Sequence, residues 1–307
     1  MNPTVRTYTH SPRSPIAFVQ EAMRLYKMKS SDIAGQVAWQ ISHLQSVEKI
    51  IRAQTGMSLD NREVLVIGPG QRVGEVFYFG LKNRVTAIDL DVIMHRMTPS
   101  AALQMWKANG ATRTVKTLGR KALGLDDKFK SQMMKQTDVK KMPPIRHLQM
   151  DATEMTLPDR SVDFVFSFSV FEHIPDPAKC LQEISRVLKP GGVCYTSLHL
   201  YSCDSGCHDL RIWSDGARPP TWAHLRPQHE AEVQPNAYMN KIRLHDWKQM
   251  LEAHSPDVTF TTDKLEQDGY EKQCRELEHL RKSGELMDYT DEELHAINLV
   301  SIWQKPL

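Results

Sequence analysis

The order of hydrophobic and polar positions divides the chain into a helical start and a longer part in which strands and helices alternate. Residues 16–28 and 32–55 predict two helices, and the second has Val37, Ile41 and Leu44 at helical spacing. Seven short runs typical of strands follow, at 63–67, 84–89, 145–150, 162–168, 192–200, 258–262 and 297–303. We therefore predict an N-terminal helical cap at 1–59 and an α/β domain at 60–307.

The strand runs predict a parallel sheet that is covered on both faces. They carry apolar residues at both odd and even positions and alternate with helical segments, which is typical of a doubly wound α/β domain. Two segments are additional to the alternating strands and helices of such a domain: a helical insertion at 92–144 and a stretch at 201–242 rich in Pro, His, Trp and Asp. The second follows the carboxyl end of a strand, where open α/β sheets bind ligands, so we predict a substrate lid there.

Composition and charge narrow the class of protein. The 307 residues are 40% hydrophobic, which is enough for a sizeable core. No run reaches the roughly 18 to 20 apolar residues that cross a bilayer, and the N-terminus lacks an apolar signal core, so we expect a cytoplasmic protein without a membrane partner. Five sparse cysteines predict free thiols. Residues 92–146 carry twelve Lys/Arg against three Asp/Glu, which suits either an anionic partner or simply a solvated helical face.

A glycine turn after the first strand run predicts a cofactor site. The sequence EVLVIGPGQRVGE leads from a hydrophobic run into Gly68-Pro69-Gly70, where a missing Cβ lets the backbone approach a ligand. Asp89 ends the second run twenty-one residues after Gly68, and its carboxylate can accept hydrogen bonds from a ribose diol. A dinucleotide fingerprint would place its third glycine at Val73, whereas the chain has it at Gly74. An NAD-dependent reductase is therefore disfavoured.

Later motifs identify a known family. Met150-Asp151-Ala152, Phe171-Glu172-His173-Ile174-Pro175 and Leu188-Lys189-Pro190-Gly191-Gly192 follow in order. With them, residues 60–200 resemble class I S-adenosylmethionine (SAM) dependent methyltransferases of the ubiquinone-biosynthesis type. The resemblance implies a Rossmann-like seven-stranded sheet with an antiparallel last strand, and SAM as cofactor. The cofactor-binding residues that it implies are Gly68, Pro69, Gly70, Asp89, Leu90, Met150, Asp151, Ala152 and Ser167.

The resemblance also implies roles for these residues. Gly68 and Gly70 would pass under the methionine part of SAM, Asp89 would hold the ribose and Asp151 the adenine amino group. The chain departs from the family at Val66, where an acid is usual, and at Arg72, where the third glycine is usual. Gln40 or His43 of the cap, or a backbone carbonyl, would then contact the SAM amino group. We interpret residues 188–192 as a helix end, with Lys189 at the helix dipole, and a glycine turn.

Candidate residues for the chemistry follow the fourth and fifth strand runs. Methyl transfer needs near-attack geometry, and a base only when the acceptor is a hydroxyl or a protonated amine. The catalytic candidates are His199, His208 and His173, of which His173 suits a pocket wall equally well. The substrate-binding candidates are Tyr201, Asp209, Trp222, His224, Tyr238 and Asn240. Zinc-ligand residue types occur at His199, Cys203, Cys207 and His208, but their spacing is not that of a zinc finger, so we expect no metal.

The expected function is methyl transfer to a small-molecule, sugar or natural-product acceptor, most simply to a hydroxyl oxygen. Two alternatives stay open: an RNA- or protein-directed methyltransferase that uses the basic insertion, and a non-catalytic methyltransferase-like binding protein, which the departures at Val66 and Arg72 allow. Ser167-Phe-Ser-Val170 replaces an Asn-Pro-Pro-Tyr-like loop, which argues against a base-directed enzyme and a nucleic-acid partner. The chain can also form a homodimer through the cap or the insertion.

Overall fold

The computed structural model describes residues 14–94, 97–213 and 218–307. Parts of the predicted cap (1–13), insertion (95–96) and lid (214–217) therefore lie outside the described residues. Internal contacts divide the described chain into two compact units. Unit 1 comprises residues up to Glu21, Ser169–Pro175 and Thr196–Ser301, and unit 2 comprises Ala22–Phe168, Asp176–Tyr195 and Ile302–Leu307.

All seven strand runs form strands of one sheet, in the order β3-β2-β1-β4-β5-β7-β6. Their bounds are β1 Glu63–Ile67, β2 Arg84–Asp89, β3 Arg146–Gln149, β4 Val162–Phe168, β5 Leu188–His199, β6 Thr259–Asp263 and β7 Asn298–Gln304. The strand β1 pairs in parallel with β2 and β4, and β2 pairs in parallel with β3. In unit 2, Gly191 N donates to Lys305 O and Lys305 N donates to Gly192 O, so β7 runs antiparallel to β5. The predicted fold class is confirmed.

One local prediction in this region is wrong. The helix α7 (Pro177–Val187) ends before Leu188, and residues 188–192 already belong to β5. The Lys189 ammonium lies 2.9 Å from the Asp163 carboxylate rather than at the helix end. Gly191 N donates to the carbonyl oxygen of Lys305, which directly follows β7, and Gly192 O accepts from Lys305 N. Gly191 itself has a φ of 73°, in the left-handed region that suits a glycine turn. The predicted place of Lys189 at the helix end is therefore wrong, whereas Gly191 does adopt a turn conformation inside the paired segment.

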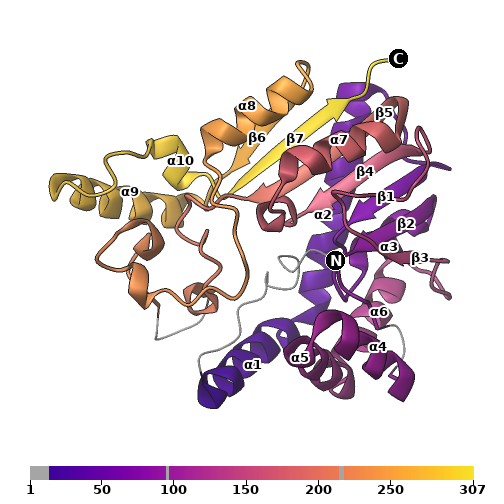
Figure 1. Cartoon of the computed structure of the whole chain (residues 1–307), viewed down its shortest axis with the longest axis horizontal. Coiled ribbons are helices and arrows are strands. Elements are labelled where there is room, and N and C mark those ends of the chain that lie inside the picture. Colours follow the sequence, from indigo (N-terminus) through magenta and orange to yellow (C-terminus); the bar gives the residue numbers. More distant parts are fainter. Residues whose placement is uncertain (1–13, 95–96, 214–217) are drawn as a thin grey trace. The chain divides into compact units, whose positions relative to one another are not determined.

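Helices of the predicted cap and of the insertion share one hydrophobic cluster in unit 2. The predicted cap helices are α1 (Pro15–Ser30) and α2 (Ile33–Thr55), and the insertion forms α4 (Pro99–Asn109), α5 (Ala111–Ala122) and α6 (Leu125–Gln136) (Figure 1). Asp32 caps α2 by accepting from Gly35 N, and Gly56 ends the helix with a positive φ. Val37 of α2, Phe77 of α3 (Gly74–Gly80) and Phe129 of α6 pack together. Cap and insertion therefore contribute to the same hydrophobic cluster.

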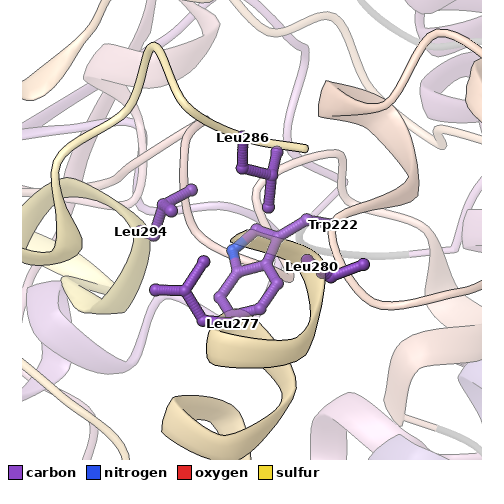
Figure 2. Packing of buried hydrophobic residues seen from close by; sticks show 5 residues of the cluster. All are labelled: Trp222, Leu277, Leu280, Leu286 and Leu294. Carbon is purple, nitrogen blue, oxygen red and sulfur yellow. The ribbon is translucent and has the colours of Figure 1, made fainter. Parts of the chain in front are cut away.

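Unit 1 contains α8 (Leu244–His254), α9 (Gln267–Lys282), α10 (Asp291–His295) and the short 3₁₀ turns η2 (Phe171–His173), η3 (Leu210–Trp213), η4 (Ala223–Leu225) and η5 (Glu230–Glu232). Figure 2 shows the Trp222 indole surrounded by four leucines of this unit, Leu277, Leu280, Leu286 and Leu294. The otherwise irregular segment 201–242 is thereby anchored to α9 and α10. Within the described ranges, no helix is long and apolar enough to span a membrane.

Candidate functional site

The carboxyl ends of four parallel strands meet along one edge of the sheet in unit 2. Ile67 at the end of β1 is in register with Ile88 of β2 and with Ser167 of β4. Gly68 N donates to Ile88 O at 2.8 Å, and Met150 N donates to Asp89 O at 2.9 Å. Gln149 Nε2 also donates to Leu90 O at 3.1 Å. The structure therefore brings together the segments that were predicted to bind the cofactor.

The glycine turn at this edge is open. Gly68 and Gly70 have φ values of 66° and 60°, in the left-handed region that glycine adopts without strain. A Cβ added to Gly70 would meet no heavy atom of the described chain within 4 Å. Val73, three residues later, also has a left-handed φ of 52° although it is β-branched and buried. The turn thus leaves space for a ligand and continues through a strained residue into α3.

Arg72, one of the two departures from the family pattern, has a structural role. Its Nη1 donates to Gln36 Oε1 and its Nη2 donates to Lys29 O, each at 2.7 Å. The guanidinium also lies 4.7 Å from the centre of the Phe129 ring. Arg72 therefore ties the glycine turn to α1, α2 and α6, a function that a glycine would lack.

Asp89 offers a carboxylate at the position predicted for the ribose. Its Oδ1 accepts from Asp91 N at 2.9 Å, and Asp91 forms an ion pair with Arg113 of α5. Burial raises the pKa of Asp89 to about 6, although the Arg113 charge and the backbone N–H of Gly70 both favour the charged form. Sequence reasoning missed Arg113, because only folding brings the insertion beside the end of β2.

The remaining cofactor candidates differ in what they contact. Asp151 Oδ1 accepts from Thr153 N and from Thr153 Oγ1, both at 2.8 Å, and so also stabilises the turn after β3. Ser167 is fully buried, and its Oγ has no hydrogen-bond partner among the described residues. Buried hydroxyls in proteins nearly always have a partner. A ligand at this edge would supply one for Ser167, so the residues present fit SAM.

Val66 of β1 stands where the family usually has an acid, and its side chain is buried in the sheet. Gln40 of α2 instead donates from Nε2 to Glu75 Oε1 at 2.6 Å, and Gln40 Oε1 is buried without a partner in the described part of the chain. Burial raises the pKa of Glu75. Nothing in the spacing of the sequence had pointed to Glu75.

The three histidines predicted to be catalytic lie together in unit 1. The ring centre of His208 is 5.0 Å from that of His173 and 5.0 Å from that of His199. His173 Nδ1 lies 2.6 Å from Tyr238 O, and His199 Nε2 lies 2.9 Å from Ser205 Oγ. Burial, with the charges of the other two histidines, lowers the pKa of His208 to about 2. Burial also lowers the pKa of His199, so His199 and His208 present neutral imidazoles near pH 7.

Two of the substrate-binding candidates line a cavity in unit 1. Tyr201 and His224 face a cavity of about 280 Å³ together with Lys241, Arg243 and Tyr289. His224 Nε2 donates to Tyr201 O at 2.7 Å, and the Lys241 ammonium lies 5.4 Å from the Tyr201 ring centre. Burial raises the pKa of Tyr201 to about 12, so its hydroxyl stays protonated. The cavity thus combines aromatic surface with positive charge.

The other candidates hold loops in place. Asp209 forms an ion pair with Arg211 and accepts from Gln234 N, and Trp222 belongs to the leucine cluster of Figure 2. Asn240 Nδ2 donates to Phe171 O and Ile174 O, while Tyr238 contributes its backbone oxygen to His173. None of these four lines the 280 Å³ cavity. The five cysteines are free, as predicted.

Comparisons with known proteins agree with this arrangement. The family described as "Methyltransferase domain" matches residues 108–196. An uncharacterized methyltransferase of Mycobacteroides abscessus is 32% identical over 106 residues, which are 34% of this chain and 41% of that protein. A probable S-adenosylmethionine-dependent methyltransferase of Mycolicibacterium smegmatis is 51% identical over 49 residues, 16% of this chain and 18% of that protein. The chain thus spans about two fifths or less of the length of these relatives.

Solved structures with low similarity to this chain include two methyltransferases. Phosphoethanolamine N-methyltransferase 2 of Haemonchus contortus, in complex with SAM, is 16% identical with a TM-score of 0.46, over 85% of this chain and 53% of that one. A SAM-dependent methyltransferase of Mesorhizobium loti is 13% identical with a TM-score of 0.39, over 80% and 92%. Residues 108–196 thus match the methyltransferase-domain family, and the aligned stretches of the sequence relatives belong to proteins named as methyltransferases.

Proposed function

We propose that the chain binds SAM at the strand edge of unit 2 and transfers its methyl group to a small-molecule, sugar or natural-product acceptor, most simply to a hydroxyl oxygen. One observation carries the cofactor part: strand register puts the open turn at Gly70, the Asp89 carboxylate and the unpartnered Ser167 hydroxyl at the same edge. When bound, SAM supplies a methyl group on a sulfonium centre. The chain's own residues orient it.

The cavity of unit 1 supports a small acceptor. A volume of about 280 Å³ is at the lower end of what ligand sites enclose. Its aromatic lining by Tyr201 and Tyr289 suits a flat or apolar body, and Lys241 suits an anionic substituent. The histidines His173, His199 and His208 remain our candidates for contact with the acceptor hydroxyl. An imidazole whose pKa is about 2 accepts a proton poorly, so we expect His208 to accept a hydrogen bond rather than to act as the base.

Calorimetric titration with S-adenosylhomocysteine tests the cofactor part. We expect micromolar binding by the wild-type protein and no binding of NADH. Asp89→Ala should weaken the affinity by about 1 to 3 kcal/mol, because a charged hydrogen-bonding partner is lost. Asp163→Asn is the matched control, since Asp163 caps the opposite, amino end of the strands by accepting from Glu63 N. An unchanged dissociation constant in Asp89→Ala would overturn the assignment of the ribose contact.

A further inference from the structure

A carboxylate and two imidazoles converge in unit 1 at the end of β4. Glu172 and His173 belong to the 3₁₀ turn η2, and His208 follows the turn after β5. One ligand atom of each residue lies within 4.8 Å of the others. We propose that Glu172, His173 and His208 bind a divalent transition-metal ion, with one coordination position left open for an oxygen ligand.

Glu172 is the first reason. Its side chain is 1% exposed, and neither carboxylate oxygen has a hydrogen-bond partner in the described residues. A buried carboxylate is costly unless a cation or several donors compensate its charge. No Lys or Arg forms an ion pair with Glu172 among the described residues, and the titratable groups beside it are the two histidines of the cluster and His199. A bound cation would supply the missing compensation.

The histidines are held as metal ligands usually are. His173 Nδ1 lies 2.6 Å from Tyr238 O, so this nitrogen carries the proton and Nε2 presents its lone pair. Such a hydrogen bond from the second ring nitrogen to a carbonyl is typical of metal-bound histidines. Asn240 fixes the same turn, because its N donates to Glu172 O and its Nδ2 donates to Phe171 O and Ile174 O. The ligands are therefore positioned before an ion binds.

The ligand set indicates the kind of ion. Two imidazoles and one carboxylate bind Zn²⁺ in catalytic sites with an open fourth position, and they also suit other first-row transition metals. Mg²⁺ and Ca²⁺ prefer oxygen ligands throughout. An ion here would lower the pKa of a coordinated hydroxyl or water. This effect on an acceptor hydroxyl rests on the proposed function, whereas the binding of the ion does not.

This site differs from the group of zinc-ligand residue types noted in the sequence. The spacing of His199, Cys203, Cys207 and His208 gave no zinc motif, and in the structure His199 Nε2 contacts Ser205 Oγ and Cys203 Sγ. Glu172 was overlooked because it reads as part of the family motif Phe-Glu-His-Ile-Pro. Only folding brings it beside His208, thirty-six residues later.

The test is a titration of EDTA-treated full-length protein with Zn²⁺ near neutral pH. We expect one ion per wild-type chain, and at least tenfold weaker binding in Glu172→Gln and in His208→Ala. His229→Gln is the matched control, because His229 is a partly exposed histidine of the same unit whose Nδ1 lies 2.7 Å from the Glu232 carboxylate, away from the cluster. Unchanged Zn²⁺ affinity in Glu172→Gln and His208→Ala, or no binding by the wild type, overturns the site.

Two further measurements keep the result interpretable. Thermal unfolding shows whether each variant folds; Zn²⁺ should raise the melting temperature of the wild type and not that of Glu172→Gln. Co²⁺ should give a spectrum of nitrogen and oxygen ligation, and a thiolate charge-transfer band would instead assign the ion to Cys203 or Cys207 and overturn the proposal. S-adenosylhomocysteine binding, measured on the same samples, reports on the cofactor site separately. If the wild-type protein does not bind S-adenosylhomocysteine, that result counts against the proposed function and not against the metal site.

Discussion

At the scale of single residues, the strand edge of unit 2 depends on side chains whose charge state is set by burial. The Asp89 carboxyl lies at the end of β2 beside the glycine turn, and its pKa is raised to about 6. The Arg113–Asp91 ion pair beside it comes from the insertion. Asp89 is thus close to its titration point near neutral pH, unlike an ordinary exposed aspartate.

This pKa predicts a pH dependence of cofactor affinity. Only the charged carboxylate accepts hydrogen bonds from both ribose hydroxyls, so affinity should be full well above pH 6 and fall as Asp89 takes up a proton through pH 6. From pH 7.5 to pH 5 we expect the dissociation constant of S-adenosylhomocysteine to rise about tenfold. Asp89→Asn should bind weakly at both pH values. The same slope in that variant would show that another group titrates.

A second residue-scale prediction concerns Arg72. Arg72→Ala removes two hydrogen bonds and the contact with Phe129, and should lower the free energy of unfolding by about 1 to 3 kcal/mol in urea titrations. Arg72→Lys should recover only part of this, because an ammonium cannot donate in two fixed directions to Gln36 and Lys29. Full recovery by lysine would mean that charge alone matters at this position.

At the scale of elements, local signals and tertiary pairing compete. The helix α2 follows its own apolar spacing and its caps at Asp32 and Gly56. The segment 188–192 instead belongs to a strand, because Lys305, which directly follows β7, forms hydrogen bonds with Gly191 and Gly192. In the turn after β5, the close approach of the backbone decides which residue fits, because no space is left for a side chain at Gly206.

Gly206→Ala should therefore be strongly destabilising. A Cβ there would lie 2.1 Å from Tyr201 O and 2.4 Å from Leu200 O, which are backbone atoms that cannot move aside without opening the turn. We expect a melting temperature several degrees lower. Gly119→Ala in α5 is the control: its Cβ meets nothing within 4 Å, and alanine favours helix by about 1 kcal/mol. Equal melting temperatures for the two variants would contradict the steric explanation.

At the scale of the whole molecule, the chain divides into two units that carry different chemistry. Unit 2 contains the glycine turn, Asp89, Asp151 and Ser167, and unit 1 contains the histidine cluster and the 280 Å³ cavity. The division cuts through β5 and β7, whose residues belong to both units. We therefore expect S-adenosylhomocysteine to slow hydrogen exchange mainly in unit 2, and Zn²⁺ to slow it mainly in unit 1.

Hydrogen exchange measures this directly. A ligand at about 100 times its dissociation constant stabilises the folded state by roughly 2.7 kcal/mol. S-adenosylhomocysteine should slow exchange at residues 67–72, 88–91 and 150–152, and Zn²⁺ should slow it at 171–174 and 206–210. The Asp89→Ala protein should lose the first effect and keep the second. Protection by S-adenosylhomocysteine that omits 67–72 and 88–91 would contradict the position of the cofactor site.

The sequence by itself determined the elements and the strand edge at which we propose that the cofactor binds. Strand runs, helical spacing and the order Gly68, Asp89, Asp151 are local patterns, and parallel strands necessarily bring their carboxyl ends to one edge. Fold class and the antiparallel last strand could be predicted for the same reason. The roles of Asp151 and Ser167 as cofactor contacts remain predictions.

Only the tertiary structure decided which side chains meet across long stretches of chain. Trp222 was predicted to contact an acceptor, yet four leucines bury it. The burial of the large apolar indole stabilises the fold more than its exposure in a substrate pocket would. Arg113 reaches Asp91, and Glu172 reaches His208, through contacts that no spacing rule encodes. Burial then sets the pKa of Asp89 and His208. Such desolvation depends on every neighbour at once, and the order of residues alone does not specify those neighbours.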